Sequence, residues 1–282
     1  MEEAIKKAHV LIEALPYIKK FHRKTIVIKY GGSILSDEKI RKGVLEDIVF
    51  LSFMGLKPLL VHGGGANISE RMRSSGKKAE FVDGLRVTDE KTLGIVEEEL
   101  QKLNDTIVGE LTDLGAKAVS ISGKNVIQVK KKQASMDLGF VGDVAKIDAD
   151  SILENLSGDT IGVILPLGKG ADKHAYNINA DEAAASIASA LKAEKLVLLT
   201  NIKGITRNID DPHSFIPTLT IKEAEGLIKD KIIQTGMIPK VKACINALHQ
   251  GVKKTHIIDA RTPHGLLLEI FTDKGVGTEI VR

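Results

Sequence analysis

TIVIKYGGS, at residues 25–33, is a short run of β-branched and apolar residues that ends in paired glycines. Its apolar residues are continuous rather than alternating, which is typical of a strand buried on both faces of a parallel sheet. Similar runs recur along the chain, and amphipathic segments with helical spacing lie between them. This alternation predicts βαβ crossovers and therefore an α/β fold, a three-layer αβα sandwich with a central, mainly parallel sheet.

The expected elements follow from these patterns. Strands are predicted at 25–30, 56–62, 116–122, 160–167, 195–200 and 255–259. Helices are predicted at 37–54, 67–75, 88–114, 181–192, 221–229 and 239–250. Two polar segments, 125–132 and 140–147, interrupt the alternation and predict a two-stranded flap.

The chain before the first strand has a different pattern. Apolar residues from Ala4 to Phe21 recur at helical spacing, with Pro16 among them. This spacing predicts a kinked amphipathic helix that lies outside the main sheet. The helix either packs on its own domain or docks on another subunit, and the periodicity alone favours neither.

Length, composition and charge exclude several classes of protein. The 282 residues are 43% hydrophobic and 27% charged, which supplies a sizeable core and excludes a disordered chain. A net charge of +3 and the absence of Trp argue against a nucleic-acid-binding surface. Cys244 is the only cysteine, so an internal disulfide and a cysteine-built metal site are excluded. No run approaches the roughly 20 apolar residues that span a bilayer. No signal peptide is evident either, so we expect a cytoplasmic protein that binds no membrane.

Glycine turns follow two of the expected strands. Gly31-Gly32 comes after the first strand, and Gly63-Gly64-Gly65 comes after the second. Glycines let backbone N–H groups approach an anion closely, and a following helix adds its positive end. Because ligands of open α/β sheets bind beyond the carboxyl ends of the strands, the two turns predict one shared anion-binding crevice. His62 has no metal-spaced partner, so we expect a hydrogen-bonded structural residue there.

Other nucleotide-binding signatures are missing. The chain contains neither G-x-x-x-x-G-K-[ST] nor G-x-G-x-x-G, which argues against a P-loop enzyme and a nicotinamide dehydrogenase. Two polar segments offer recognition groups instead. Arg86, in FVDGLRVTD at residues 81–89, is a candidate clamp on a carboxylate, or else a solvated or salt-bridged residue. Asp181, in YNINADEAAA at residues 176–185, is either a helix cap or part of a recognition edge.

Five segments together resemble the amino acid kinase family, in its branch that acts on N-acetyl-L-glutamate. They are KYGG at 29–32, VHGGG at 61–65, residues 81–89, NINAD at 177–181 and GMIPKV at 236–241. The resemblance implies phosphorylation of the γ-carboxylate of N-acetyl-L-glutamate by ATP with Mg²⁺, giving N-acetylglutamyl 5-phosphate in arginine biosynthesis. Alternatives are a kinase of another amino acid carboxylate, such as glutamate or aspartate, and a non-catalytic amino-acid and nucleotide sensor of the same fold.

The resemblance also assigns domains and site residues. It implies an interaction helix at 1–24, an amino-acid-substrate domain at 25–193 and a nucleotide-binding domain at 194–282. The implied catalytic residues are Lys29, Lys240 and Asp181, and no residue is expected to bind a metal directly. The implied substrate-binding residues are Gly64, Gly65, Arg86, Asn177 and Asn179, and the phosphate-binding backbone is that of Gly31, Gly32 and Gly64. The implied nucleotide-binding residues are Thr200, Asn201, Gly204, Ile205, Ile233 and Gln234.

Regulation and assembly are implied as well. Relatives with a helix ahead of the first strand tend to be hexamers, as trimers of dimers, that arginine inhibits. The resemblance therefore predicts a homo-oligomer with an arginine site formed by Tyr17, Lys195, His256, Glu269 and Gly275. Lys29 fits a functional role on physical grounds too, because a lysine in a buried strand is costly unless it has a partner.

Overall fold

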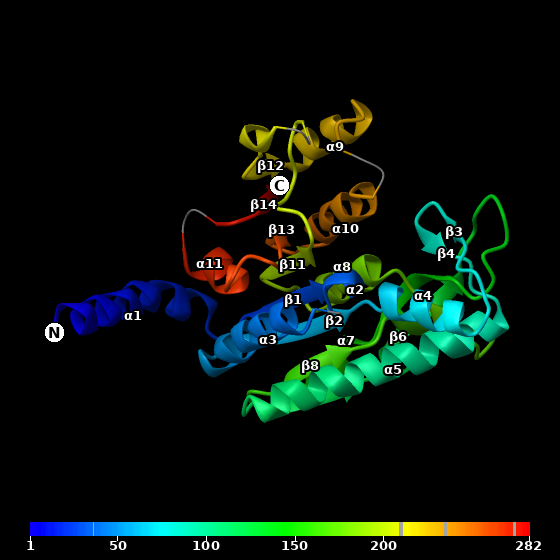
Figure 1. Ribbon diagram of the computed structural model, residues 1–282, viewed down its shortest axis with the longest axis horizontal. Helices are drawn as coiled ribbons and strands as arrows, with labels where there is room; N and C mark the ends of the chain where they lie inside the picture. The colour runs from blue at the N-terminus through cyan, green and yellow to red at the C-terminus, as the bar shows by residue number, and fades with distance from the viewer. Residues whose placement is uncertain (36, 209–210, 234–235, 273–274) are drawn as a thin grey trace.

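A twisted central sheet with helices on both faces forms the body of the protein (Figure 1). The computed structural model describes residues 1–35, 37–208, 211–233, 236–272 and 275–282. Within these residues the main sheet has eight strands in the order β12-β14-β13-β11-β1-β2-β8-β5. Neighbours run parallel except for the antiparallel pair β13 and β14, so the sheet is mainly parallel as expected. The strands are β1 (Thr25–Tyr30), β2 (Lys57–His62), β5 (Ala118–Ile121), β8 (Ile161–Ile164), β11 (Lys195–Thr200), β12 (Thr218–Thr220), β13 (Lys254–Asp259) and β14 (Thr278–Val281).

Two apolar cores lie on the two faces of this sheet. On β1, Val27 packs into one core, while Ile26 and Ile28 pack into the other. Both faces are therefore buried, which explains why the strand sequences are continuously apolar. The first core is closed by α7 (Ala149–Asn155), α8 (Ala180–Ala190), α9 (Ile221–Lys229) and α10 (Ile238–His249). The second is closed by α3 (Glu38–Phe53), α5 (Glu90–Asp113) and α11 (Gly265–Phe271). The predicted three-layer αβα sandwich is thus confirmed.

The expected elements form with small shifts at their ends, and two predictions need correction. The strand expected at 160–167 ends at Ile164, and β9 (Leu167–Gly170) begins after Pro166. The expected flap strands form as β6 (Ile127–Lys131) and β7 (Gly142–Ile147), but they belong to a four-stranded sheet in the order β10-β9-β6-β7. The additional strands carry little strand signal, because β9 is short and glycine-rich and β10 (Ala175–Asn177) has only three residues.

Several short elements have no counterpart in the sequence prediction. Elements of two to four residues cannot display a 3.6-residue or two-residue period, so hydrophobic patterning does not reveal them. They are α2 (Gly32–Leu35), α6 (Gly123–Val126), β3 (Phe81–Val82), β4 (Leu85–Arg86), β12, β14 and the 3₁₀ turn at Pro212–Ser214. The seven-residue helices α7 and α11 are not predicted either. The longer α4 (Gly65–Ser74) forms where a helix was expected, and it begins within the second glycine turn.

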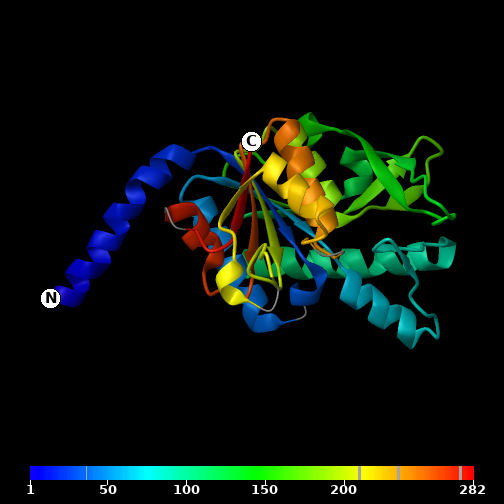
Figure 2. The same ribbon diagram turned by 90° about the horizontal axis from the view of Figure 1, so that it is seen from above.

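The N-terminal helix α1 (Glu2–Phe21) projects from the body (Figure 1). It continues through Pro16 and changes direction toward its C-terminal end (Figure 2). Val10, Leu11 and Ile12 are 63%, 67% and 67% exposed. Contact with the body is made near the C-terminal end of the helix, where the Tyr17 ring packs edge-on against Phe271 at 6.5 Å. Most of the apolar face of α1 is therefore not covered by its own chain. None of the described helices is both long and apolar enough to cross a membrane.

The packing of β8 gives a test of the two-sided core. A Cβ atom on Gly162 would lie 2.5 Å from Leu59 Cδ1 and 2.7 Å from Leu156 Cδ2. Gly162→Val should therefore lower the free energy of unfolding by about 1–3 kcal/mol through overpacking. Gly226→Ala in α9, where a Cβ atom would meet nothing within 4 Å, should raise it by about 0.5–1 kcal/mol. Chemical denaturation measures both, and equal effects of the two substitutions would contradict this account.

Candidate active site

Lys29, Asp181 and Lys240 meet at one point, although they come from three separate elements. Lys29 lies near the end of β1, whereas Asp181 and Lys240 lie in the first turns of α8 and α10. Lys29 Nζ lies 2.8 Å from Asp181 Oδ1, and Lys240 Nζ donates to Asp181 Oδ2 at 2.7 Å. Lys29 and Asp181 are only 6% and 5% exposed. One buried carboxylate is thus held between two ammonium groups.

Burial and neighbouring charge shift the pKa values of this group. Burial lowers the pKa of Lys29; the Asp181 carboxylate works against that shift, and the Lys240 ammonium adds to it. Burial alone would raise the pKa of Asp181, but the two lysines outweigh it and lower the value to about 2. Asp181 is therefore ionised at neutral pH. With both lysines protonated, the cluster carries an excess positive charge that attracts an anion.

Asn179 explains why Asp181 is available to the lysines. Asn179 is the N-cap of α8, and its side-chain oxygen accepts from the backbone N–H groups of Asp181 and Glu182 at 2.9 and 3.3 Å. The cap is therefore the asparagine, as this residue type often is. The sequence is consistent with Asp181 either as the helix cap or as part of a group that recognises a ligand. Since Asn179 is the cap and Asp181 pairs with the two lysines, the structure favours the second interpretation.

The two glycine turns emerge beside these charges. β1 and β2 are parallel neighbours with Tyr30 opposite His62, so Gly31-Gly32 and Gly63-Gly64-Gly65 leave the sheet at the same edge. A Cβ atom on Gly64 would lie 2.8 Å from Leu100 Cδ2, so a larger residue would collide with α5. α4 begins at Gly65, and the first backbone N–H groups of a helix have no partner within it. Gly63, Gly64 and Gly65 line the same cavity as Lys29 and Asp181. The turns thus supply neutral donors next to the lysine pair.

A cavity of about 240 Å³ joins the lysine–aspartate cluster to the second glycine turn. Arg86, which is 6% exposed, lines it and donates to Gly65 O at 2.9 Å and to Ser69 Oγ at 2.8 Å. Its guanidinium also lies 4.7 Å from the centre of the Phe81 ring. Burial lowers the pKa of Arg86, and no carboxylate among the described residues forms an ion pair with it. A buried cation without an acidic partner favours an anionic ligand.

The remaining substrate-binding candidates line the same cavity. Asn177, on β10, donates from Nδ2 to Thr88 Oγ1 at 3.3 Å, and Asn179 follows it along one wall. Apolar side chains of Ile68, Leu100 and Val141 complete the lining. The cavity therefore combines positive charge, amide groups and an apolar wall.

The nucleotide-binding candidates lie at the neighbouring strand end. Thr200 ends β11, which pairs with β1, and its hydroxyl accepts from Ile202 N at 3.1 Å. Asn201 is exposed, and Gly204 has φ +142°. Ile205 and Ile233 are 3% and 4% exposed and belong to the core, so any contact they make with a nucleotide comes from their backbone. Gln234 lies outside the described residues.

The five residues implied for an effector also come together, at a second cavity. This cavity, of about 160 Å³, lies between α1 and the C-terminal part of the chain and is lined by Tyr17, Lys195, Glu269 and Gly275. Beneath it, His256 Nδ1 lies 2.7 Å from Glu269, and His256 Nε2 lies 3.1 Å from Lys195 Nζ. Burial lowers the pKa of Lys195 to about 8, against the opposing charge of Glu269. The cluster is thus buried, charged and separate from the first cavity.

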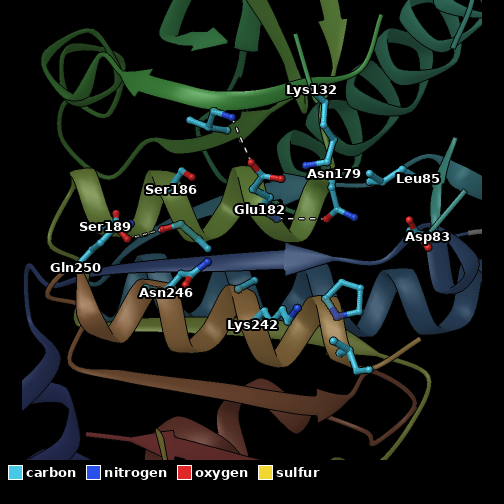
Figure 3. A pocket seen from close by; sticks show the side chains of 16 residues that line it. Asp83, Leu85, Lys132, Asn179, Glu182, Ser186, Ser189, Lys242, Asn246 and Gln250 are labelled. Carbon is cyan, nitrogen blue, oxygen red and sulfur yellow. Dashed lines mark hydrogen bonds between the residues drawn. The ribbon is translucent and has the colours of Figure 1, made fainter. Parts of the chain in front are cut away.

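A larger groove of about 600 Å³ runs between α8, α10 and β7 (Figure 3). It shares Leu85 and Asn179 with the cavity beside the lysine pair. Two of its charged groups already have partners, since Lys132 pairs with Asp143 and Glu182 accepts from Val144 N at 3.2 Å; Asp83 and Lys242 also line it. Lys29 and Asp181 line the smaller cavity and not this groove, and Lys240 is in the lining of neither, so we place the reactive site in the smaller cavity.

Asn104 is a buried polar residue that the sequence analysis did not single out. It lies in α5, is fully buried, and donates to His62 Nε2 at 3.0 Å and to Val163 O at 3.1 Å. His62 is thus a hydrogen-bonded residue, as expected. Nothing in the local sequence around Asn104 indicates this contact, because its partners are distant in the chain and only the fold brings them together.

Comparisons with known proteins identify the family of this chain. Residues 24–259 match the amino acid kinase family. Acetylglutamate kinase of Caldanaerobacter subterraneus subsp. tengcongensis is 49% identical over 281 residues, covering 99% of this chain and 94% of that protein. Acetylglutamate kinase of Heliobacterium modesticaldum is 46% identical, and the match covers the whole of both chains.

Solved structures with the same architecture include N-acetylglutamate synthase from Neisseria gonorrhoeae in complex with coenzyme A and N-acetyl-glutamate. It superposes with a TM-score of 0.88 at 28% identity; the match covers 98% of this chain but 63% of that one. Giardia carbamate kinase, with a TM-score of 0.67 at 16% identity, shares the fold. The chain therefore belongs to the amino acid kinase family and, within it, to the acetylglutamate kinases, which are phosphotransferases with a carboxyl group as acceptor.

Proposed function

We propose that this protein transfers the γ-phosphoryl group of ATP to the γ-carboxylate of N-acetyl-L-glutamate, giving N-acetylglutamyl 5-phosphate in arginine biosynthesis. The observation that carries the proposal is the buried carboxylate of Asp181 between Lys29 and Lys240, at 2.8 and 2.7 Å, beside two glycine turns. Homology to acetylglutamate kinases over nearly the full chain supports the choice of substrate.

The chemistry fits this set of groups. The acceptor carboxylate has an ordinary pKa of about 4.3, so it is ionised at neutral pH and needs no general base. The barrier comes instead from repulsion between two anions and from the charge on the transferred phosphoryl group. In our proposal Lys29 and Lys240 hold phosphoryl oxygens from two sides, and Asp181 orients both ammonium groups. Backbone N–H groups of Gly31, Gly32 and Gly64 add donors where charge is greatest.

Arg86 supplies the proposed anchor for the substrate's α-carboxylate. Its buried guanidinium has neutral acceptors, Gly65 O and Ser69 Oγ, and a bidentate contact with a carboxylate suits its planar geometry. We assign the acetamido group to Asn177 and Asn179 and its methyl to the apolar wall of Ile68, Leu100 and Val141. This apolar wall favours acetylated over free glutamate or aspartate. The two lysines held by Asp181, of which Lys29 lines the cavity, favour an enzyme over a sensor of the same fold.

ATP is proposed to bind along the edge formed by the ends of β1 and β11, over the domain of residues 194–282. Thr200, Asn201 and Gly204 are the nearest candidates, with backbone contacts from Ile205 and Ile233. Mg²⁺ would arrive on the nucleotide phosphates. The described residues contain no cluster of three His, Cys, Asp or Glu side chains able to hold a metal ion. We place the reaction in the cytoplasm, because its proposed substrates are charged, water-soluble metabolites.

We further propose that arginine inhibits the enzyme by binding at the second cavity. The buried Glu269 carboxylate accepts from Val276 N at 2.9 Å and lies at the cavity wall, where a guanidinium would pair with it. Tyr17 of α1 lines the same cavity, so assembly through α1 would reach the effector site. The exposed apolar residues of α1 and the sheet edge at β5 are the two surfaces proposed for a hexamer built as a trimer of dimers.

Removing one of the two ammonium groups tests the catalytic assignment. Lys29→Met should lower kcat about 100- to 1,000-fold, as loss of one transition-state donor does, with a smaller effect on the KM of either substrate. Lys57→Met, at the opposite end of the neighbouring strand β2, is the matched control and should keep near-normal turnover. A steady-state assay with N-acetyl-L-glutamate measures both. Normal kcat for Lys29→Met would remove the assigned role.

Removing the guanidinium tests the acceptor site. Arg86→Ala should raise the KM for N-acetyl-L-glutamate about 10- to 100-fold, the effect of one lost charged hydrogen-bond pair, and leave the KM for ATP unchanged. Arg73→Ala, on the exposed side of α4, is the control. The same assay with free glutamate identifies the substrate. Faster turnover of free than of acetylated glutamate would instead support the glutamate-kinase alternative.

Placing a charge on α1 tests assembly and regulation together. Leu11→Glu should lower the oligomeric mass measured by light scattering and weaken arginine inhibition, because a charge cannot be buried in an apolar interface without a partner. Lys19→Glu introduces the same charge at an already polar, exposed position and should change neither property. An unchanged mass for Leu11→Glu would rule out assembly through this face.

A further inference from the structure

The peptide bond between Gly63 and Gly64 lies in the wall of the cavity proposed for phosphoryl transfer. Its neighbours are fixed, since Gly63 N donates to Tyr30 O at 2.9 Å and Arg86 donates to Gly65 O at 2.9 Å. The plane itself has glycine on both sides, and glycine adopts almost any backbone conformation. Without a further contact, this plane could rotate at little cost.

His62 provides that contact. Its ring is fully buried, and Nδ1 lies 3.3 Å from Gly63 O. In a trans peptide the C=O and the following N–H point in opposite directions within one plane. A hydrogen bond to Gly63 O therefore directs Gly64 N–H away from His62. Across the described residues, Gly64 N–H has no hydrogen-bond acceptor of its own. It lies on the wall of the cavity that Lys29 and Asp181 also line.

Asn104 determines which nitrogen of His62 carries the proton. The Asn104 amide nitrogen is 3.1 Å from Val163 O, which only accepts, so this end of the amide must be the donor. The same nitrogen lies 3.0 Å from His62 Nε2, which must therefore accept and carry no proton. The neutral ring then has its proton on Nδ1, where it faces Gly63 O. Burial lowers the pKa of His62 to about 4, against a smaller effect of the Gly63 carbonyl, so the ring is neutral at pH 7.

We propose that His62 is a positioning residue which, held in its Nδ1–H form by Asn104, orients the Gly63–Gly64 peptide so that Gly64 N–H points at the transferred phosphoryl group. The inference rests on the proposed function, because it names the donor that the reaction uses. This role explains why His62 and Asn104 are buried side by side although neither contacts a substrate in the proposed function.

The tautomer can be measured without any assay of activity. The ¹⁵N spectrum of the full-length protein, labelled only at histidine, should contain a His62 ring with protonated Nδ1 and bare Nε2 that stays unchanged from pH 6 to pH 8. His256, whose Nδ1 faces Glu269 and whose Nε2 faces Lys195, is expected to give a second signal of this form. The signal belongs to His62 if it is missing from His62→Gln. A protonated Nε2, or a charged ring at pH 7, for the signal so assigned would overturn the inference. A spectrum in which no histidine ring has a protonated Nδ1 and a bare Nε2 would overturn it without any variant.

Two substitutions separate positioning from structural support. Asn carries its amide nitrogen where His has Nδ1, so His62→Asn retains a donor to Gly63 O. Gln reaches the place of Nε2, so His62→Gln retains only the acceptor for Asn104. Since small displacements of a reacting group cost about 100-fold, His62→Gln should lose about 10- to 100-fold in kcat with the KM for ATP unchanged. His62→Asn should keep at least about ten times more activity than His62→Gln, the reverse of what volume alone predicts.

Leu111→Ala is the control for stability. Leu111 is fully buried in the same helix as Asn104 but does not line the site, so the substitution should lower Tm and leave kcat unchanged below Tm. Equal kcat values for His62→Asn and His62→Gln, or losses of kcat that follow Tm across all three variants, would overturn the inference. An unsubstituted enzyme that does not phosphorylate N-acetyl-L-glutamate would refute the proposed function instead, and the tautomer result would still stand.

Discussion

The ionic contact between one buried carboxylate and two lysines is the constraint on which the site depends. Asp181 holds Lys29 and Lys240 within hydrogen-bonding distance, although the three residues come from a strand and two different helices. A buried ion costs several kcal/mol to remove from water, so none of the three is stable there alone. Their geometry in turn requires β1, α8 and α10 to keep their positions, which ties the packing of both cores to the chemistry of the site.

The parallel sheet provides the rest of the arrangement. Because β1 and β2 run in the same direction, both of their glycine turns open at one edge, next to the N-terminal ends of α8 and α10. Backbone N–H groups, helix ends and ammonium groups therefore converge without any metal-binding side chains of the described residues. Such a site suits the transfer of a group between two anions, where alignment and fixed positive charge matter more than acid–base chemistry.

The sequence predicted the main layers well because six strands are long enough, and apolar enough, to show burial on both faces. Strands such as β3 and β10 are too short for a period, and only tertiary pairing defines them. Within the site, Lys29 was identifiable because a lysine in an apolar strand needs a partner. The sequence could not show that Asn179 caps the helix while Asp181 forms the ion pairs, because both residue types are common helix caps. Nor could it show the contact of Asn104 with His62, because the two residues lie in different elements.

The buried guanidinium of Arg86 has a thermodynamic consequence for the protein as a whole. Before the acceptor binds, this cation has only neutral oxygens, a sulfur atom and an aromatic ring around it, so the folded state bears an uncompensated desolvation cost. Under the proposed function, a carboxylate that binds to Arg86 would cancel that cost, and it would bind the native chain alone. The proposed role of Arg86 would therefore link the supply of the acceptor to the folding equilibrium, and a cell rich in the acceptor would hold more of this protein folded than one depleted of it.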